Sequence, residues 1–168
     1  LQSCHAEVVR ISKLVDQLAE LSMLENESPA YDRALFDFND LCTSIIADFE
    51  SAKESCDAKL ILDIPKPAPL YGDISRVKQC IVNLLSNAIK YTREDSEVRI
   101  AYEKQQGEVV LRVSDNGVGI PSDSLPHIFE RFYRVDKSRS KNTGGMGVGL
   151  SITKAIVEGH GGKITVNS

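Results

Sequence analysis

The sequence lacks an uninterrupted apolar run of the ~18–20 residues that a membrane-spanning helix requires, and no signal-peptide pattern opens it. We therefore expect any membrane link to lie outside this segment and the segment itself to be cytoplasmic. Internal repeats and low-complexity tracts are also missing. At 168 residues, with 42% hydrophobic and 26% charged residues, the chain can bury one sizeable core, and we expect one domain with an appendage.

Cysteine motifs and an excess of positive charge are missing as well. The four cysteines (Cys4, Cys42, Cys56 and Cys80) show no C-x-x-C spacing and no clustering with histidine, which argues against a zinc or redox site. We interpret them as small apolar thiols in a reducing compartment. The 20 Lys and Arg residues against 24 Asp and Glu residues give a net charge of −4, which argues against nucleic acid as a general partner.

Hydrophobic periodicity predicts most of the secondary structure. Helices are predicted over 7–25 and over 38–56, from an N-cap at Asp73 or Ser75 to about Tyr91, and over 147–158. Strands are predicted at KLILDIP (59–65), at LYGD (70–73), in a hairpin of 97–104 with 108–115 around QQG, and at the start of a strand within GGKITVNS (161–168).

Two segments break this periodicity. Residues 26–36, which contain Pro29, predict a linker or hinge, and residues 122–146 predict a long irregular loop with short helical turns. Helices and strands are interleaved without regular alternation. This order predicts an α/β two-layer sandwich, in which helices pack on one face of a mixed sheet and a long N-terminal helix precedes it.

The stretch NLLSNAIKYT (83–92) places two asparagines one turn apart on a predicted helix, although asparagine is less favourable there than alanine by roughly 0.5–0.7 kcal/mol. Four polar residues fall within about 60° of one another on that helix: Arg76, Asn83, Asn87 and Lys90. Amide oxygens suit Mg²⁺, and a lysine one turn on suits phosphates bound to the same ion. A polar surface without a function is the alternative.

The stretch VVLRVSDNGVGI (109–120) leads a β-branched strand into Asp115, Gly117 and Gly119. A carboxylate at a strand end accepts hydrogen bonds, for instance from an exocyclic amine, and glycines let the backbone approach a planar ligand closely. A tight turn with an Asx-type hydrogen bond produces the same pattern. This stretch alone leaves both interpretations open.

A glycine-rich stretch, GGMGVGL (144–150), leads into the last predicted helix. Backbone N–H groups at a helix start, unobstructed by side chains, form an anion site suited to phosphate. The stretch is not a P-loop, because no G-K-[ST] follows the glycines, and it does not follow a strand directly as a dinucleotide-binding fingerprint does.

Basic residues gather just before these glycines, in FERFYRVDKSRSKNTGG (129–145). They are Arg131, Arg134, Lys137, Arg139 and Lys141. A solvated charge run needs no function. As a lid over a polyphosphate, the segment would close on the anion and open to release product.

Together and in this order, the four stretches resemble the catalytic and ATP-binding domain of sensor histidine kinases. NLLSNAIKYT is similar to that family's N box, DNGVGI to its G1 box, FERFYR to its F box and GGMGVGL to its G2 box. The resemblance covers about residues 7–168. It implies the Bergerat ATP-binding sandwich shared with Hsp90, gyrase and MutL, with ATP and Mg²⁺ as ligands.

The resemblance implies a role for each matched residue. Asn87 would bind Mg²⁺, while Asn83 and Lys90 would serve the phosphates and Tyr91 would line the base and sugar. Asp115 would accept the adenine amino group beside Gly117, Gly119 and Ile120. The lid would contribute Tyr133 and Arg134, and the phosphate cradle would consist of Gly145, Gly147, Val148, Gly149 and Leu150.

Position 83 distinguishes two functions within this superfamily. Relatives that hydrolyse ATP typically place a glutamate four residues before the metal-binding asparagine, as the base for water. This chain has Asn83 there, and an amide cannot take that proton at neutral pH. Phosphoryl transfer to a protein group is therefore favoured over a hydrolysing ATPase, and a regulator that only binds nucleotide is the third possibility.

The N-terminal stretch RISKLVDQLAELSMLE resembles the second helix of the family's dimerisation and phosphoacceptor hairpin, which divides the chain into 1–30 and a catalytic domain at 31–168. No H-E-[LIV]-[RK]-x-P motif is present, and no proline follows His5 as that motif requires. The acceptor histidine is thus expected on a first helix absent from this chain, and no catalytic residue is assigned. Expected partners are that helix in a homodimer and a response-regulator receiver domain. Both ends suggest a fragment, whose last sheet strand is truncated.

Overall fold

The computed structural model describes residues 2–26, 30–51, 58–91, 96–135 and 147–168. The chain forms two compact units. One unit is continuous, Tyr31–Gly119, and the other combines Leu1–Ala30 with Ile120–Ser168.

The continuous unit contains a mixed sheet, as predicted. Its elements are β1 (Arg33–Asp37), α2 (Phe38–Ser51), β2 (Lys59–Asp63), β3 (Pro69–Asp73), α3 (Ile74–Lys90), β4 (Glu97–Gln105) and β5 (Glu108–Asp115). The three-stranded sheet has the order β2-β4-β5, parallel between β2 and β4 and antiparallel between β4 and β5. β1 and β3 pair separately as an antiparallel two-stranded sheet.

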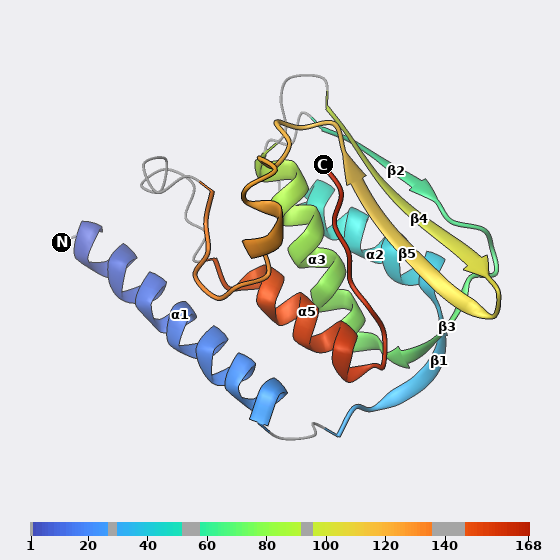
Figure 1. Ribbon diagram of the computed structural model, residues 1–168, viewed down its shortest axis with the longest axis horizontal. Coiled ribbons are helices and arrows are strands. Elements are labelled where there is room, and N and C mark those ends of the chain that lie inside the picture. Colours follow the sequence, from blue (N-terminus) through green and yellow to red (C-terminus); the bar gives the residue numbers. More distant parts are fainter. Residues whose placement is uncertain (1, 27–29, 52–57, 92–95, 136–146) are drawn as a thin grey trace. The chain divides into compact units, whose positions relative to one another are not determined.

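Helices α2 and α3 lie on one side of the three-stranded sheet, which confirms the predicted layering of this unit (Figure 1). Strand side chains alternate between two faces, so every second residue of β4 points to the helices. Val98, Ile100 and Tyr102 are accordingly buried. They join a core with residues of both helices: Phe38, Leu41, Cys42, Ile45, Ile81, Leu85 and Ala88.

The β4–β5 hairpin turns at Gln106 and Gly107, within the predicted QQG. Their φ angles are 51° and 89°, so both residues adopt the left-handed conformation of a type I′ turn. Glycine tolerates this conformation without cost, which explains its place in the turn.

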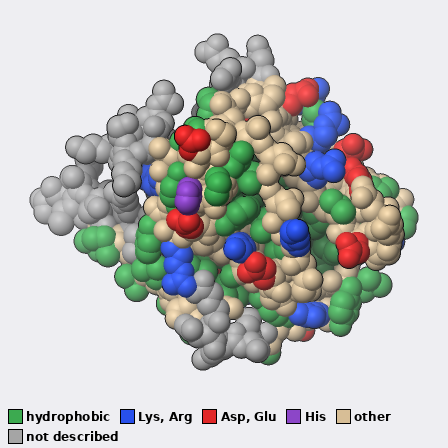
Figure 2. Space-filling model, in the orientation of Figure 1, with side chains coloured by type: hydrophobic (Ala, Val, Ile, Leu, Met, Phe, Trp, Pro, Cys, Tyr) green, Lys and Arg blue, Asp and Glu red, His purple; other side chains and the backbone are tan. Residues whose placement is uncertain are grey.

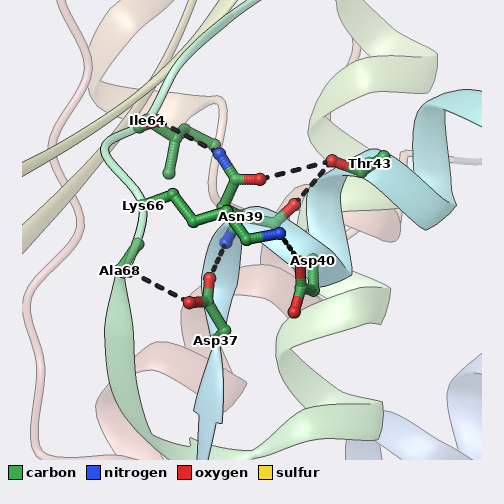
Figure 3. A network of polar contacts seen from close by, with 7 residues as sticks. All are labelled: Asp37, Asn39, Asp40, Thr43, Ile64, Lys66 and Ala68. Carbon is green, nitrogen blue, oxygen red and sulfur yellow. Dashed lines mark hydrogen bonds and ion pairs between the residues drawn. The ribbon is translucent and has the colours of Figure 1, made fainter.

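The start of α2 is tied to the connection between β2 and β3 by the network drawn in Figure 3. Asp37 accepts hydrogen bonds from the backbone N–H groups of Asn39 at 2.8 Å and Ala68 at 3.2 Å. The Asn39 side chain donates to the Ile64 carbonyl at 3.0 Å. A hydrogen bond from Lys66 to Asp40, 2.6 Å long, raises the pKa of that lysine. The contacts fix where β3, and therefore α3 after it, begins.

The second unit contains α1 (Gln2–Asn26), a 3-10 turn (Leu125–His127) and α5 (Gly149–Gly159). α1 packs against α5. Leu21 and Leu24 near the end of α1 are buried, as are Ile152 and Ile156 on α5. Two helices pack on each other through apolar stripes of this kind.

Two predicted segments differ from the structure. Residues 33–36, assigned to the linker at 26–36, form β1 together with Asp37, because they pair with β3 over the full register from Arg33↔Asp73 to Asp37↔Pro69. Residues 163–168, expected to start a strand, are described and belong to no strand. Their exposure still alternates from Lys163 to Val166, as in a strand, but a strand also requires ladder hydrogen bonds. The end of the second predicted helix, 52–56, lies outside the described residues.

Charged side chains of both signs are interspersed on the face shown in Figure 2. Ion pairs among the described residues are exposed, for example Lys59–Glu97 at 3.3 Å and Arg112–Glu103 at 3.2 Å, so each contributes about 0–1 kcal/mol. Within the described ranges, none of the helices combines the length and apolar content needed to cross a bilayer.

Candidate functional site

The polar face of α3 presents the predicted asparagines. Asp73 precedes the helix as its N-cap, as predicted, and accepts from the N–H groups of Ser75 at 3.0 Å and Arg76 at 3.1 Å. One face of α3 is buried through Cys80, Ile81, Leu85 and Ala88. On the other face Asn83 and Asn87 are half-buried. The helix thus carries both amides on the face opposite its buried one.

Asn87 differs from its neighbours in its contacts. Its side-chain amide makes no hydrogen bond to the part of the chain that the structure describes, although its carbonyl accepts from the N–H of Tyr91 at 3.1 Å. Lys90, one turn on, places its ammonium 5.3 Å from the centre of the Tyr91 ring. A half-buried amide that has no partner among the described residues has a donor and an acceptor to offer a ligand.

The turn after β5 contacts the end of α3. The N–H of Val118 donates to the carbonyl of Tyr91 at 3.2 Å. A Cβ atom on Gly117 would lie 2.5 Å from that carbonyl oxygen and 2.8 Å from Oδ1 of Asp115, so only glycine fits there. The structure therefore brings together two of the predicted pieces, NLLSNAIKYT and DNGVGI.

The carboxylate of Asp115 is exposed at the end of β5 and is oriented by its own turn. Its Oδ1 atom accepts from the N–H of Gly117 at 2.9 Å, an Asx-type hydrogen bond. Gly119 has a φ of 73°, a left-handed conformation that glycine adopts freely. Asp115 thus forms an ordinary Asx-type turn and also has an exposed carboxylate that can accept a hydrogen bond.

Asn116 takes part in this turn, although it is not among the predicted site residues. Its Oδ1 accepts from the N–H of Glu97, the first residue of β4, at 2.8 Å. An asparagine directly after a strand is a known source of such side chain–backbone hydrogen bonds, and that signal was available in the sequence.

The start of α5 contacts the FERFYR segment within the second unit. The N–H of Phe132 donates to the carbonyl of Gly147 at 2.8 Å. Gly147 has a φ of 73°, and a Cβ there would lie 2.8 Å from the carbonyl oxygen of Tyr133. Val148, the residue before α5, makes no side-chain capping hydrogen bond. Two further predicted pieces, FERFYR and the end of GGMGVGL, are therefore neighbours.

The predicted lid residue Tyr133 is half-buried and held by several side chains. Its hydroxyl donates to Oγ of Ser124 at 3.0 Å, and its ring lies 5.5 Å from that of His127. His127 in turn contacts Glu130 through Nδ1 at 2.7 Å.

The other predicted site residues of this unit are partly defined. Arg134, Gly149 and Leu150 are half-buried, Val148 is buried, and the N–H of Ile120 donates to Oγ of Ser168 at 2.6 Å. Gly145 and the basic residues Lys137, Arg139 and Lys141 lie outside the described residues.

Thiols and carboxylates do not assemble a metal centre in the described part of the chain, where no group of three or more His, Cys, Asp or Glu side chains is placed to hold an ion. Cys42 and Cys80 are buried free thiols, and burial raises the pKa of each to about 12. They remain neutral at physiological pH, in keeping with their interpretation as core residues.

The chain is similar in sequence to one family of known proteins. The model of the histidine kinase-, DNA gyrase B- and HSP90-like ATPases matches residues 72–168. The sensor protein kinase WalK of Staphylococcus aureus is 39% identical over 165 residues, which are 96% of this chain and 39% of that relative. The chain thus spans well under half the length of this relative.

Solved structures of the same class are similar. The histidine kinase AdeS of Acinetobacter baumannii superposes with a TM-score of 0.75 at 28% identity, over 94% of this chain and 72% of that one. A nucleotide-free catalytic domain of the histidine kinase ThkA superposes with a TM-score of 0.68 at 28% identity, over 80% of this chain and 87% of that one.

Proposed function

The chain belongs to the family of histidine kinase-, DNA gyrase B- and HSP90-like ATPases, and from this premise we propose that it binds Mg-ATP and transfers the γ-phosphoryl group. The acceptor is a histidine on a separate helix, from which the phosphoryl group passes to an aspartate of a response regulator. The similarity to sensor histidine kinases over nearly the whole chain supports this function.

The observation that carries the proposal is the contact between the Asp115–Val118 turn and Tyr91 at the end of α3. It puts an exposed carboxylate next to a helix whose polar face carries Asn87. Asp115 accepts a hydrogen bond from the exocyclic amine of adenine, which guanine lacks at that position. Gly117 lets the turn that carries Asp115 approach Tyr91 closely.

Magnesium fits the donors that α3 offers. Asn87 supplies a neutral amide oxygen with no partner among the described residues, and Mg²⁺ is held by few protein groups because it keeps several waters and binds phosphate oxygens. When bound, the ion neutralises the charge that develops on the transferring phosphoryl group. Asn83 and Lys90 contact the phosphates from the same helix face.

The start of α5 supports a phosphate cradle formed by Gly145, Gly147, Val148, Gly149 and Leu150. The helix has no side-chain cap, so its first turn can present backbone N–H groups to an anion. The backbone of Tyr133 adjoins Gly147, and Tyr133 and Arg134 contribute the edge of the lid over ribose and phosphates.

Transfer to protein is favoured over hydrolysis because Asn83 occupies the position where hydrolysing relatives carry a glutamate. A carboxamide cannot deprotonate water at neutral pH. The phosphoryl group therefore goes to an imidazole, which is nucleophilic without a strong base.

We assign residues 1–30 to the second helix of the dimerisation and phosphoacceptor hairpin. Val8, Ile11 and Val15 on α1 are 55–59% exposed, which supports a partner helix in a homodimer. Any membrane anchor belongs to other segments of the parent protein, and this segment works in the cytoplasm.

Calorimetric titration with ATP and GTP, each with and without Mg²⁺, tests the nucleotide site. We expect ATP to bind more tightly than GTP and Mg²⁺ to strengthen both. Equal affinities for the two nucleotides that do not respond to Mg²⁺ would contradict the proposal.

Incubation with γ-labelled ATP tests the transfer. The chain alone should form no acid-labile phosphohistidine, and a supplied acceptor helix should become labelled. Steady release of inorganic phosphate, with no label on the helix, would instead identify a hydrolysing ATPase, and nucleotide binding without either product would identify a regulator.

A further inference from the structure

We propose that Asn116 is a positioning residue for the carboxylate of Asp115 and thereby determines the preference for adenine. This inference rests on the proposed function, because it concerns how the proposed base-reading group is held. The observation is the 2.8 Å hydrogen bond from the N–H of Glu97 to Oδ1 of Asn116.

The hydrogen bond replaces the next rung of the β4–β5 ladder. Val98↔Asp115 is the last pair in the antiparallel register, so Glu97 and Asn116 would be the next to face each other. The side chain of Asn116, and not its backbone, satisfies the N–H of Glu97. The backbone can therefore leave the sheet directly after Asp115 and still leave no strand donor unpaired.

A second anchor holds the other side of the turn. Two residues after Asn116, the N–H of Val118 donates to the carbonyl of Tyr91 at 3.2 Å. The turn is thus attached to β4 at one end and to α3 at the other. Gly117 between the two anchors has no room for a Cβ, so the segment cannot shift far toward α3.

The orientation of the Asp115 carboxylate depends on this turn. Its Oδ1 accepts from the N–H of Gly117 at 2.9 Å, which turns the other oxygen, Oδ2, into the acceptor left for a ligand. Asp115 has no further hydrogen bond to the described residues. If the Asn116 anchor is lost, Gly117 moves, and Oδ2 moves with it relative to the base.

A purely structural role for Asn116 predicts something different. Asparagine commonly closes a strand end in this way, and Asn116 is exposed. If the Asn116 side chain only closes the end of the strand, its removal lowers the stability of the protein or lowers the affinities for all nucleotides by the same factor. If the Asn116 side chain positions Asp115, its removal lowers the affinity for ATP more than the affinity for GTP, because only adenine offers the amine from which Asp115 accepts a hydrogen bond.

Calorimetry on Asn116→Ala and Asn116→Asp distinguishes these roles. The ratio of GTP to ATP dissociation constants, measured with Mg²⁺, cancels any effect on the triphosphate. For Asn116→Ala we expect this ratio to fall by about three- to tenfold, the value of one hydrogen bond, with GTP affinity almost unchanged. Asn116→Asp keeps an acceptor oxygen for Glu97 and should retain the wild-type ratio.

An unchanged ratio in Asn116→Ala, or a fall of equal size in Asn116→Asp, would overturn the inference. If Asn116→Ala does not fold, hydrogen exchange of the Glu97 amide in the wild-type chain decides: slow exchange supports the anchor, and exchange as fast as an exposed amide excludes it. A wild-type chain without preference for ATP would contradict the proposed function itself, a different result from either.

Discussion

Helices α3 and α5 both carry proposed nucleotide-binding residues, and they begin in different ways. α3 starts behind Asp73, whose carboxylate accepts from the N–H groups of Ser75 and Arg76. α5 starts behind Val148, which provides no side-chain cap, and behind Gly147 with its left-handed backbone. One helix start is capped by a side chain of its own chain, and the other has no side-chain cap.

This difference indicates what each helix contributes. α3 offers side chains from its third and fourth turns, above all Asn87, while its N-terminus serves stability. α5 offers its backbone, whose path depends on Gly147. Substitutions of side chains should therefore affect binding on α3, and substitutions that alter backbone geometry should affect binding at α5.

The largest expected effect is that of Asn87→Ala. Removal of the amide oxygen should abolish the gain in ATP affinity that Mg²⁺ provides, and affinity in the presence of Mg²⁺ should fall by roughly a hundredfold. The measurement is titration with and without Mg²⁺. Ser86→Ala, next to it and exposed on the same helix, is the control and should bind like wild type. Unchanged Mg²⁺ dependence in Asn87→Ala would show that the metal is held elsewhere.

Gly147→Ala should have the next largest effect. The new Cβ would lie 2.8 Å from the Tyr133 carbonyl oxygen, so the backbone before α5 must move, and we expect ATP affinity to fall by about tenfold. Gly161→Ala is a matched control, because Gly161 has a similar φ of 80° and nothing within 4 Å of its Cβ. Both variants introduce an alanine at a similar positive φ and so add similar backbone strain. Equal ATP affinities in the two variants would therefore mean that the backbone path before α5 does not matter for binding.

Asp73→Ala should lower the stability of the protein without changing its affinity for ATP. It removes the cap of α3 and should lower the free energy of unfolding by about 1 kcal/mol, as measured by urea denaturation. Asp73→Asn keeps a capping oxygen and should cost only a few tenths of a kcal/mol. A change in ATP affinity of the folded Asp73→Ala chain would remove the distinction between the two helix starts.

The smallest effect is expected for Ser151→Ala in the first turn of α5. The Ser151 hydroxyl donates to the Val148 carbonyl at 2.8 Å and points into the protein, so its loss should cost about 0.5–1 kcal/mol of stability. ATP affinity should remain within about twofold of wild type, since the backbone and not this side chain faces the anion. A large loss of affinity would assign α5 a side-chain role.

Local patterns made much of the fold predictable. The Asp73 cap, the QQG turn and the strand that ends at Asp115 each follow from residues close together in the sequence, and all three are confirmed. β1 was missed because its pairing with β3 joins residues 33–37 to 69–73, and its exposed Leu35 hides the alternation of a half-buried strand. Residues 163–168 show the converse, since an alternating pattern without ladder partners forms no strand.

The candidate site was predictable to the extent that it depends on sequence motifs. The contact of Gly117 with Tyr91 follows from a glycine requirement that the DNGVGI motif already signals. The hydrogen bond between Asn116 and Glu97 does not, because it joins residues 19 positions apart through one side chain. The roles of the fifteen proposed nucleotide-binding residues stay predictions until a ligand is bound.

The central claim is that Asn87 of α3 binds the divalent cation of the nucleotide. Nuclear magnetic resonance with ATP and paramagnetic Mn²⁺ in place of Mg²⁺ tests it most directly. The amide signal of Asn87 should broaden strongly. That of Gly107 should not, because β5 separates it from Asp115 by about 25 Å. An Asn87 signal that stays as sharp as that of Gly107 would contradict the claim.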